Sequence, residues 1–164
     1  MEIKDADAVP TAVRAVKVTR AELGAAIRDC LDDVWAFVRS SSDITPHHNI
    51  VLYKGDPGAG PADIEIGVQV ARPFPEMSPA GVHCSSLPAG RVVSAVHVGP
   101  YDEMGRTYDA LLAFARDGGH EIRGPSWEIY GDWSDDPSKV ETEIIASLPS
   151  PLRGRGRGEG LAAT

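Results

Sequence analysis

Residues 91–130 read RVVSAVHVGPYDEMGRTYDALLAFARDGGHEIRGPSWEIY, and they predict a strand, a helix and a second strand. The β-branched run over 91–98 indicates a strand, which Gly99-Pro100 ends. Apolar residues recur at helical spacing over 101–116, and Gly118-Gly119 stops the helix. Residues 126–130 form the next strand. A turn over 131–139 and a last strand over 140–147 complete a strand–helix–strand–strand unit, written βαββ below.

The first half of the chain has the same order of elements. A β-rich run over 12–18 precedes a capping-box pattern at Thr19-x-x-Glu22 and an amphipathic helix over 20–39. Strands over 49–54 and 62–71 follow, separated by a Gly- and Pro-rich turn. The two halves match in order, at Tyr53 and Tyr130 and at Glu65 and Glu143, so we predict an internal duplication.

The predicted fold is α+β: two pseudo-symmetric βαββ modules share an antiparallel sheet, with helices on one face and a ligand groove between the modules on the other. Module one spans about 12–71 and module two 91–149, so residues 1–149 are expected to form one domain. The proline-containing stretch 72–90 is expected to be a linker, and residues 1–11 a loosely held lead-in. The Arg/Gly-rich tail at 150–164 is expected to be disordered.

Charge and cysteine usage exclude several classes of function. The net charge is −8, and the arginines of the tail leave the remaining chain more acidic still, so we expect no direct binding of nucleic acid. No apolar run is long enough to span a bilayer, and the first residues do not resemble a secretion signal. Cys30 and Cys84 form no metal or disulfide pattern. We expect a cytoplasmic protein with no metal and no cofactor.

Glu128 is the first candidate for a functional residue. Alternation over SWEIY puts Glu128 and Tyr130 on one face of a strand and Trp127 and Ile129 on the other, and we expect the apolar Trp127 face to lie under the helices. A carboxylate among aromatic rings is poorly solvated, so its pKa tends to rise. A lipophilic cation would relieve that cost, and the ring faces would add cation–π attraction. The alternative is that Glu128 is only the solvated member of an alternating strand.

Further candidates follow from the repeat and from neighbouring aromatic residues. Val51 and Tyr53 occupy the positions in module one that Glu128 and Tyr130 occupy in module two. Trp133 lies past a glycine, where strict alternation can be lost, and is a candidate pocket wall. The expected ligand-binding residues are Glu128, Tyr130, Tyr53, Tyr101, Trp133, Val51, Glu143 and Ile145. Whether the linker residues Phe74, Met77 and His83 reach the pocket is left open.

Three short motifs in the second half resemble the GyrI-like effector-binding domain, which occurs alone or fused to helix-turn-helix regulators of the AraC and MerR types. The motifs are His97-Val98-Gly99-Pro100-Tyr101, Gly124-Pro125 followed by Glu128-x-Tyr130, and Thr142-Glu143-Ile144. The resemblance implies paired βαββ modules with a pocket between them, a pocket-facing Glu128 and hydrophobic, often cationic ligands. Because only residues 1–11 precede the first expected strand, we expect no DNA-binding domain.

The function that we favour at this point is a stand-alone multidrug-binding protein that holds hydrophobic, cationic aromatic molecules with Glu128 and aromatic side chains. The resemblance implies two alternatives. One is a hydrolase that opens cyclopropane-type DNA-alkylating antibiotics, with Glu128, Tyr130 and Tyr53 as acid–base groups. The other is a protein inhibitor of DNA gyrase. The residues do not separate binding from turnover, and they identify no ligand, protein partner or oligomeric state.

Overall fold

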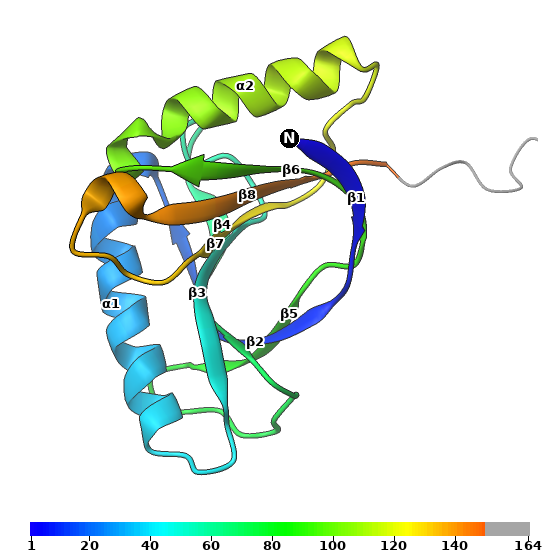
Figure 1. Ribbon diagram of the computed structural model, residues 1–164. Helices are drawn as coiled ribbons and strands as arrows, with labels where there is room; N and C mark the ends of the chain where they lie inside the picture. Colours follow the sequence, from blue (N-terminus) through cyan, green and yellow to red (C-terminus); the bar gives the residue numbers. More distant parts are fainter. Residues whose placement is uncertain (150–164) are drawn as a thin grey trace, which may run out of the picture.

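The computed structural model describes residues 1–149. The strands form a curled sheet, and two α-helices lie outside it (Figure 1). The strands are β1 (Glu2–Ala6), β2 (Val9–Val18), β3 (Pro46–Tyr53), β4 (Ala62–Val70), β5 (His83–Leu87), β6 (Gly90–Val98), β7 (Ser126–Tyr130) and β8 (Glu141–Ser147). The helices are α1 (Arg20–Arg39) and α2 (Met104–Asp117), with short 3-10 helices η1 (Tyr101–Glu103) and η2 (Pro137–Lys139). The prediction of an α+β fold is confirmed. The tail expected to be disordered, residues 150–164, lies outside the described residues.

Within residues 1–149 the strands form one antiparallel sheet in the order β1-β6-β8-β7-β3-β4-β2-β5. The order is symmetric about the central pair β7–β3. The elements β2-α1-β3-β4 on one side correspond to β6-α2-β7-β8 on the other, as two βαββ modules require. Descent of the modules from one duplicated unit stays a prediction.

The expected lead-in and linker contain two strands that the sequence analysis did not predict. These strands are β1 and β5, and each of them pairs with the opposite module. Ala6 lies opposite Gly90 and Val9 lies opposite Leu87, so the pairing register continues without a shift across the bend between β1 and β2. The β1–β2 and β5–β6 segments therefore act as two long paired strands that close the sheet on itself, as its curl in Figure 1 shows.

The closed sheet encloses a hydrophobic core. The interior side chains are Val13, Ile50, Leu52, Leu87, Val92, Trp127 and Ile145. Tight curvature requires a residue without a side chain at Gly67 of β4, where an added Cβ would lie 1.8 Å from the Ala12 carbonyl oxygen. The interior thus holds a packed cluster of buried apolar side chains.

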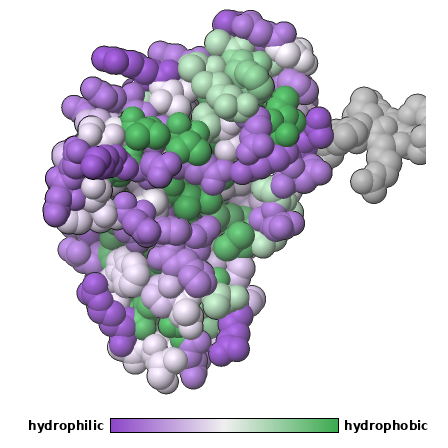
Figure 2. All heavy atoms as spheres, in the orientation of Figure 1, coloured by the Kyte–Doolittle hydropathy of each residue, from purple (hydrophilic) through white to green (hydrophobic). Residues whose placement is uncertain are grey.

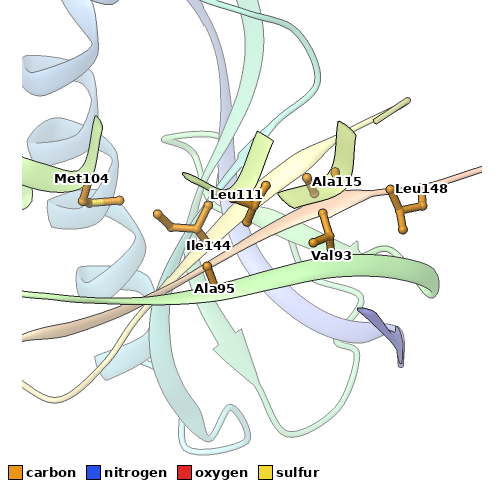
Figure 3. Packing of buried hydrophobic residues seen from close by; sticks show 8 residues of the cluster. Val93, Ala95, Met104, Leu111, Ala115, Ile144 and Leu148 are labelled. Atoms are coloured by element: carbon orange, nitrogen blue, oxygen red, sulfur yellow. The ribbon is translucent and has the colours of Figure 1, made fainter. Parts of the chain in front are cut away.

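Both helices pack on the outer face of the sheet. Helix α1 begins with the predicted capping box, in which the Thr19 N–H donates to the Glu22 carboxylate at 2.9 Å. Helix α2 turns Met104, Leu111 and Ala115 toward strands β6 and β8 (Figure 3). Each helix covers its own module, and the central strands β3 and β7 lie between the two helices. The candidate site described below is on these two strands.

The surface in the view of Figure 2 is mostly hydrophilic, with hydrophobic residues in separate patches. Among residues 1–149, neither helix combines the length and apolar character needed to cross a bilayer.

Candidate functional site

Strand β7 carries Glu128 and Tyr130 to the helix-covered outer face of the sheet. Their predicted placement on the face opposite the helices was wrong, because Tyr130 packs with the α1 cluster and Glu128 meets a side chain of α2. The alternation itself was right, since Trp127 and Ile129 lie on the other face, inside the closed sheet. We expected the apolar face of this strand to lie under the helices, but closure of the sheet creates a second apolar space, and Trp127 lies there.

Three phenol groups converge on the Glu128 carboxylate. The Tyr130 hydroxyl donates to Oε1 at 2.5 Å and the Tyr53 hydroxyl donates to the same oxygen at 3.2 Å. The Tyr108 hydroxyl of α2 donates to Oε2. The glutamate is 4% exposed. No lysine, arginine or histidine among residues 1–149 forms an ion pair with it. The cluster is therefore a buried carboxylate held by neutral donors.

The electrostatics of the cluster follow from this burial. Burial raises the pKa of Glu128, and the hydrogen bonds from the three tyrosines oppose the rise. Burial and the negative charge of Glu128 raise the pKa values of Tyr53, Tyr108 and Tyr130. The phenols consequently keep their protons near neutral pH and remain donors to the carboxylate.

A cavity of about 460 Å³ lies beside this cluster, a size typical of small-molecule sites. Tyr130 forms part of its wall, whereas Glu128 lies behind Tyr130 and does not reach the cavity surface. The other walls come from α1, the first residues of β3, η1 and the loop after β7, including Leu31, Trp35, Asn49, Tyr101 and Trp133. The cavity wall is thus mainly apolar and aromatic, it also includes His47, His48 and Asp132, and the Glu128 carboxylate lies one side chain away.

Tyr101 is held at the cavity by a histidine of the strand before it. The ring of Tyr101 meets that of Tyr130 edge-on, with centroids 5.6 Å apart. The buried His97 binds the Pro100 carbonyl through Nε2 at 2.8 Å and the Thr107 hydroxyl through Nδ1 at 2.7 Å. The carbonyl can only accept, so Nε2 carries the proton. His97 therefore fixes the η1 turn that carries Tyr101.

The structure brings most of the expected residues together. Tyr53 and Tyr130 each donate a hydrogen bond to Glu128, and Val51 lies directly opposite Glu128 in the strand register, buried in the α1 cluster. Tyr101 and Trp133, which is 79% exposed, line the cavity.

Two expected residues are not part of this group. Ile145 lies in the enclosed core, and Glu143 lies opposite Ile129 on the interior face. Glu143 there accepts hydrogen bonds from Lys4 Nζ and Ser94 Oγ, both at 2.7 Å. Strand β8 presents its even-numbered positions to the helices, so the odd-numbered candidates point away from Glu128.

The open question about the linker residues has a clear structural answer. Phe74 packs against Phe37 of α1, with ring centroids 5.6 Å apart, and Met77 is largely exposed. His83 begins β5 and binds the Gly81 carbonyl at 2.9 Å. The cavity wall includes none of these three residues.

Sequence reasoning missed Tyr108, Trp35 and Asn49. Tyr108 and Trp35 have helical spacing with apolar neighbours, and such positions read as core. The sequence offered one indication for Tyr108, its hydroxyl group. A tyrosine on the buried side of a helix needs a hydrogen-bond acceptor, and the carboxylate of Glu128 is such an acceptor.

Comparison with known proteins agrees with this architecture. The chain belongs to the GyrI-like small-molecule-binding domain family, whose model matches residues 27–149. No curated protein matches the chain significantly. The C-terminal domain of EcmrR is similar in structure, with a TM-score of 0.74 and 18% identity over 92% of this chain and 97% of that domain. Against the EcmrR chain in its DNA complex, this chain spans 57% of the length, with a TM-score of 0.76.

Two further structures share the fold. SAV2435, solved bound to tetraphenylphosphonium, has a TM-score of 0.67 and 12% identity, covering 90% of this chain and 93% of SAV2435. A hydrolase encoded by lin2189 from Listeria innocua has a TM-score of 0.60 and 14% identity, covering 90% of this chain and 91% of the hydrolase. At these identities the likenesses establish a shared fold.

Proposed function

We propose that this protein binds hydrophobic aromatic cations of varied structure, with Glu128 as the counter-charge. The observation that carries the proposal is a buried carboxylate whose hydrogen-bond partners among residues 1–149 are three phenols, beside an aromatic-walled cavity. A buried carboxylate without a cation is costly, and a ligand that brings the missing charge lowers that cost. A ligand is thereby selected by its charge.

The aromatic walls support the same ligand class. Trp35, Tyr101, Tyr130 and Trp133 can each offer a ring face or edge to a flat or propeller-shaped aromatic ligand. Ring faces also attract cations directly. Stacking depends little on the detailed ring system, so such walls suit several drug-like cations. The tetraphenylphosphonium held by SAV2435 is a cation of this kind, on the same fold.

Calorimetric titration with tetraphenylphosphonium tests the proposal. We expect the wild type to bind and the Glu128→Gln variant to bind at least about tenfold more weakly, because the amide keeps the shape but removes the charge. Glu141→Gln is the matched control, since Glu141 is exposed on β8 and its replacement changes the net charge equally. Equal affinity of Glu128→Gln and wild type would show that Glu128 is not the counter-charge.

A second candidate function is hydrolysis of a strained electrophile. The favouring observation is that the hydroxyl of Tyr130, which lines the cavity, donates to Glu128, whose pKa is raised by burial. Such a pair can relay a proton between a substrate and a carboxylate. Incubation with a cyclopropane-bearing alkylating antibiotic, followed by mass spectrometry, distinguishes the functions: turnover adds the mass of one water, whereas binding leaves the compound unchanged.

A further inference from the structure

Asn49 lies on the same face of the sheet as the Glu128 cluster and lines the cavity. It precedes Val51 and Tyr53 by two and four residues on β3, so its side chain projects from the same outer face. The β3–β7 register, with Ile50 opposite Ile129, sets Asn49 beside Tyr130. The cavity surface therefore holds a carboxamide next to the phenol that covers Glu128.

The orientation of this carboxamide is fixed by Trp35 of α1. The indole Nε1–H donates to Asn49 Oδ1 at 2.9 Å. An indole nitrogen can only donate, so it requires the oxygen of the amide and not its NH₂ group. The guanidinium of Arg39 lies 5.4 Å above the Trp35 ring and helps to hold the indole in place.

The NH₂ group of Asn49 is left available to a ligand. Among residues 1–149 it donates to no side-chain acceptor. Buried polar atoms without a partner in this part of the chain are limited to the hydroxyls of Thr11 and Thr142, so the Asn49 amide nitrogen remains accessible. Because Asn49 is in the cavity wall, a ligand in the cavity can approach this accessible nitrogen.

We propose that Asn49 is a specificity residue that donates a hydrogen bond to an acceptor oxygen on the ligand, with Trp35 as its positioning residue. The inference rests on the proposed function and narrows its ligand class. The preferred molecules are aromatic cations that also carry a carbonyl or ether oxygen. The cationic centre lies toward Tyr130 and Glu128, and the oxygen lies against Asn49.

A matched pair of probes tests this inference. The first is (4-acetylphenyl)triphenylphosphonium, which offers a carbonyl oxygen, and the second is (4-isopropylphenyl)triphenylphosphonium, which has nearly the same shape and no acceptor. We expect the wild type to bind the acetyl probe about fivefold more tightly, as one net hydrogen bond allows. Both probes carry one positive charge, so the ratio of their dissociation constants is insensitive to changes in protein charge.

The decisive variant is Asn49→Asp, which keeps an oxygen for Trp35 but removes the NH₂ donor. The acetyl preference should fall to about one, whereas Gln69→Glu, the same chemical change at the other carboxamide of the chain, should retain it. Trp35→Phe should also reduce the preference, because the side-chain amide of Asn49 can then rotate and exchange the positions of its oxygen and NH₂ group. Equal binding of the probes by wild type, or an unchanged preference in Asn49→Asp, overturns the inference while cation binding stands. Absence of binding by either probe overturns the proposed function and this inference together.

Discussion

The two faces of the sheet each bury a glutamate, and the surroundings of the two carboxylates differ. On the enclosed face, Glu65 is 5% exposed and is bound by Lys54 Nζ at 2.9 Å and Ser85 Oγ at 2.7 Å. On the helix-covered face, Glu128 is 4% exposed and is bound by three phenols. Similar burial thus accompanies a complete ion pair in one case and a charge without a cation in the other.

The interior arrangement is repeated in the second module, where Glu143 is bound by Lys4 and Ser94. The outer face has no such repeat, because the residue opposite Glu128 is Val51. The two modules are alike at the interior glutamates, each of which is bound by a lysine and a serine. They differ on the outer face, where Glu128 has no cation beside it. This difference supports our proposals that the interior acids stabilise the fold and that the outer face binds the ligand.

The largest expected effect concerns the interior face. Trp127→Ala should lower the free energy of unfolding by about 3–5 kcal/mol, because it empties the centre of the enclosed core. Trp133→Ala is the matched control, and it should change stability by less than about 0.5 kcal/mol because Trp133 is exposed. Urea unfolding followed by circular dichroism measures both. A small effect of Trp127→Ala would contradict the assignment of the interior as the main core.

A smaller effect separates the two glutamates. At pH 8, Glu65→Gln should destabilise the protein by about 1–3 kcal/mol, because it weakens charge-assisted hydrogen bonds with Lys54 and Ser85. Glu128→Gln should not destabilise it, because no cation loses its partner. The same urea experiment compares the variants at one pH. Equal losses of stability would remove the distinction between the two sites.

The smallest effect is a pH dependence specific to Glu128. Burial raises the pKa of this carboxyl in the folded protein, so the folded state holds the proton at pH values where the unfolded chain has lost it. The associated stability is present below the unfolded pKa of about 4.3 and is lost as the pH rises to the folded value. Glutamine does not titrate, so the stability of Glu128→Gln relative to wild type should increase from pH 4 upward, by about 1.4 kcal/mol per unit of pKa shift. A pH-independent difference would contradict the buried-charge account.

The sequence predicted local features well and closure poorly. The helix over 20–39, the strand over 126–130 and the alternation of Trp127 and Glu128 were confirmed, since each depends on neighbouring residues. The strands β1 and β5 were missed because their stability comes from pairing with the opposite module, which the local sequence does not reveal. The wrong face for Glu128 followed from that omission, because an open sheet has only one dry side.

The candidate site likewise contains residues that the sequence could group and residues that it could not. Glu128, Tyr53 and Tyr130 could be grouped from strand alternation and the repeat, and the structure joins them by hydrogen bonds. Tyr108 and Asn49 could not, because their contacts depend on how α2 and α1 lie across the sheet. The roles of Glu128 and Asn49 in ligand binding are proposals, and the titrations described above test them.

The central claim is that Glu128 selects ligands by positive charge. Tetraphenylphosphonium and tetraphenylborate have the same shape and opposite charge, so the ratio of their dissociation constants isolates that selection. We predict that the wild type prefers the phosphonium by at least about tenfold and that Glu128→Gln loses most of this preference. The same preference in wild type and Glu128→Gln would contradict the account.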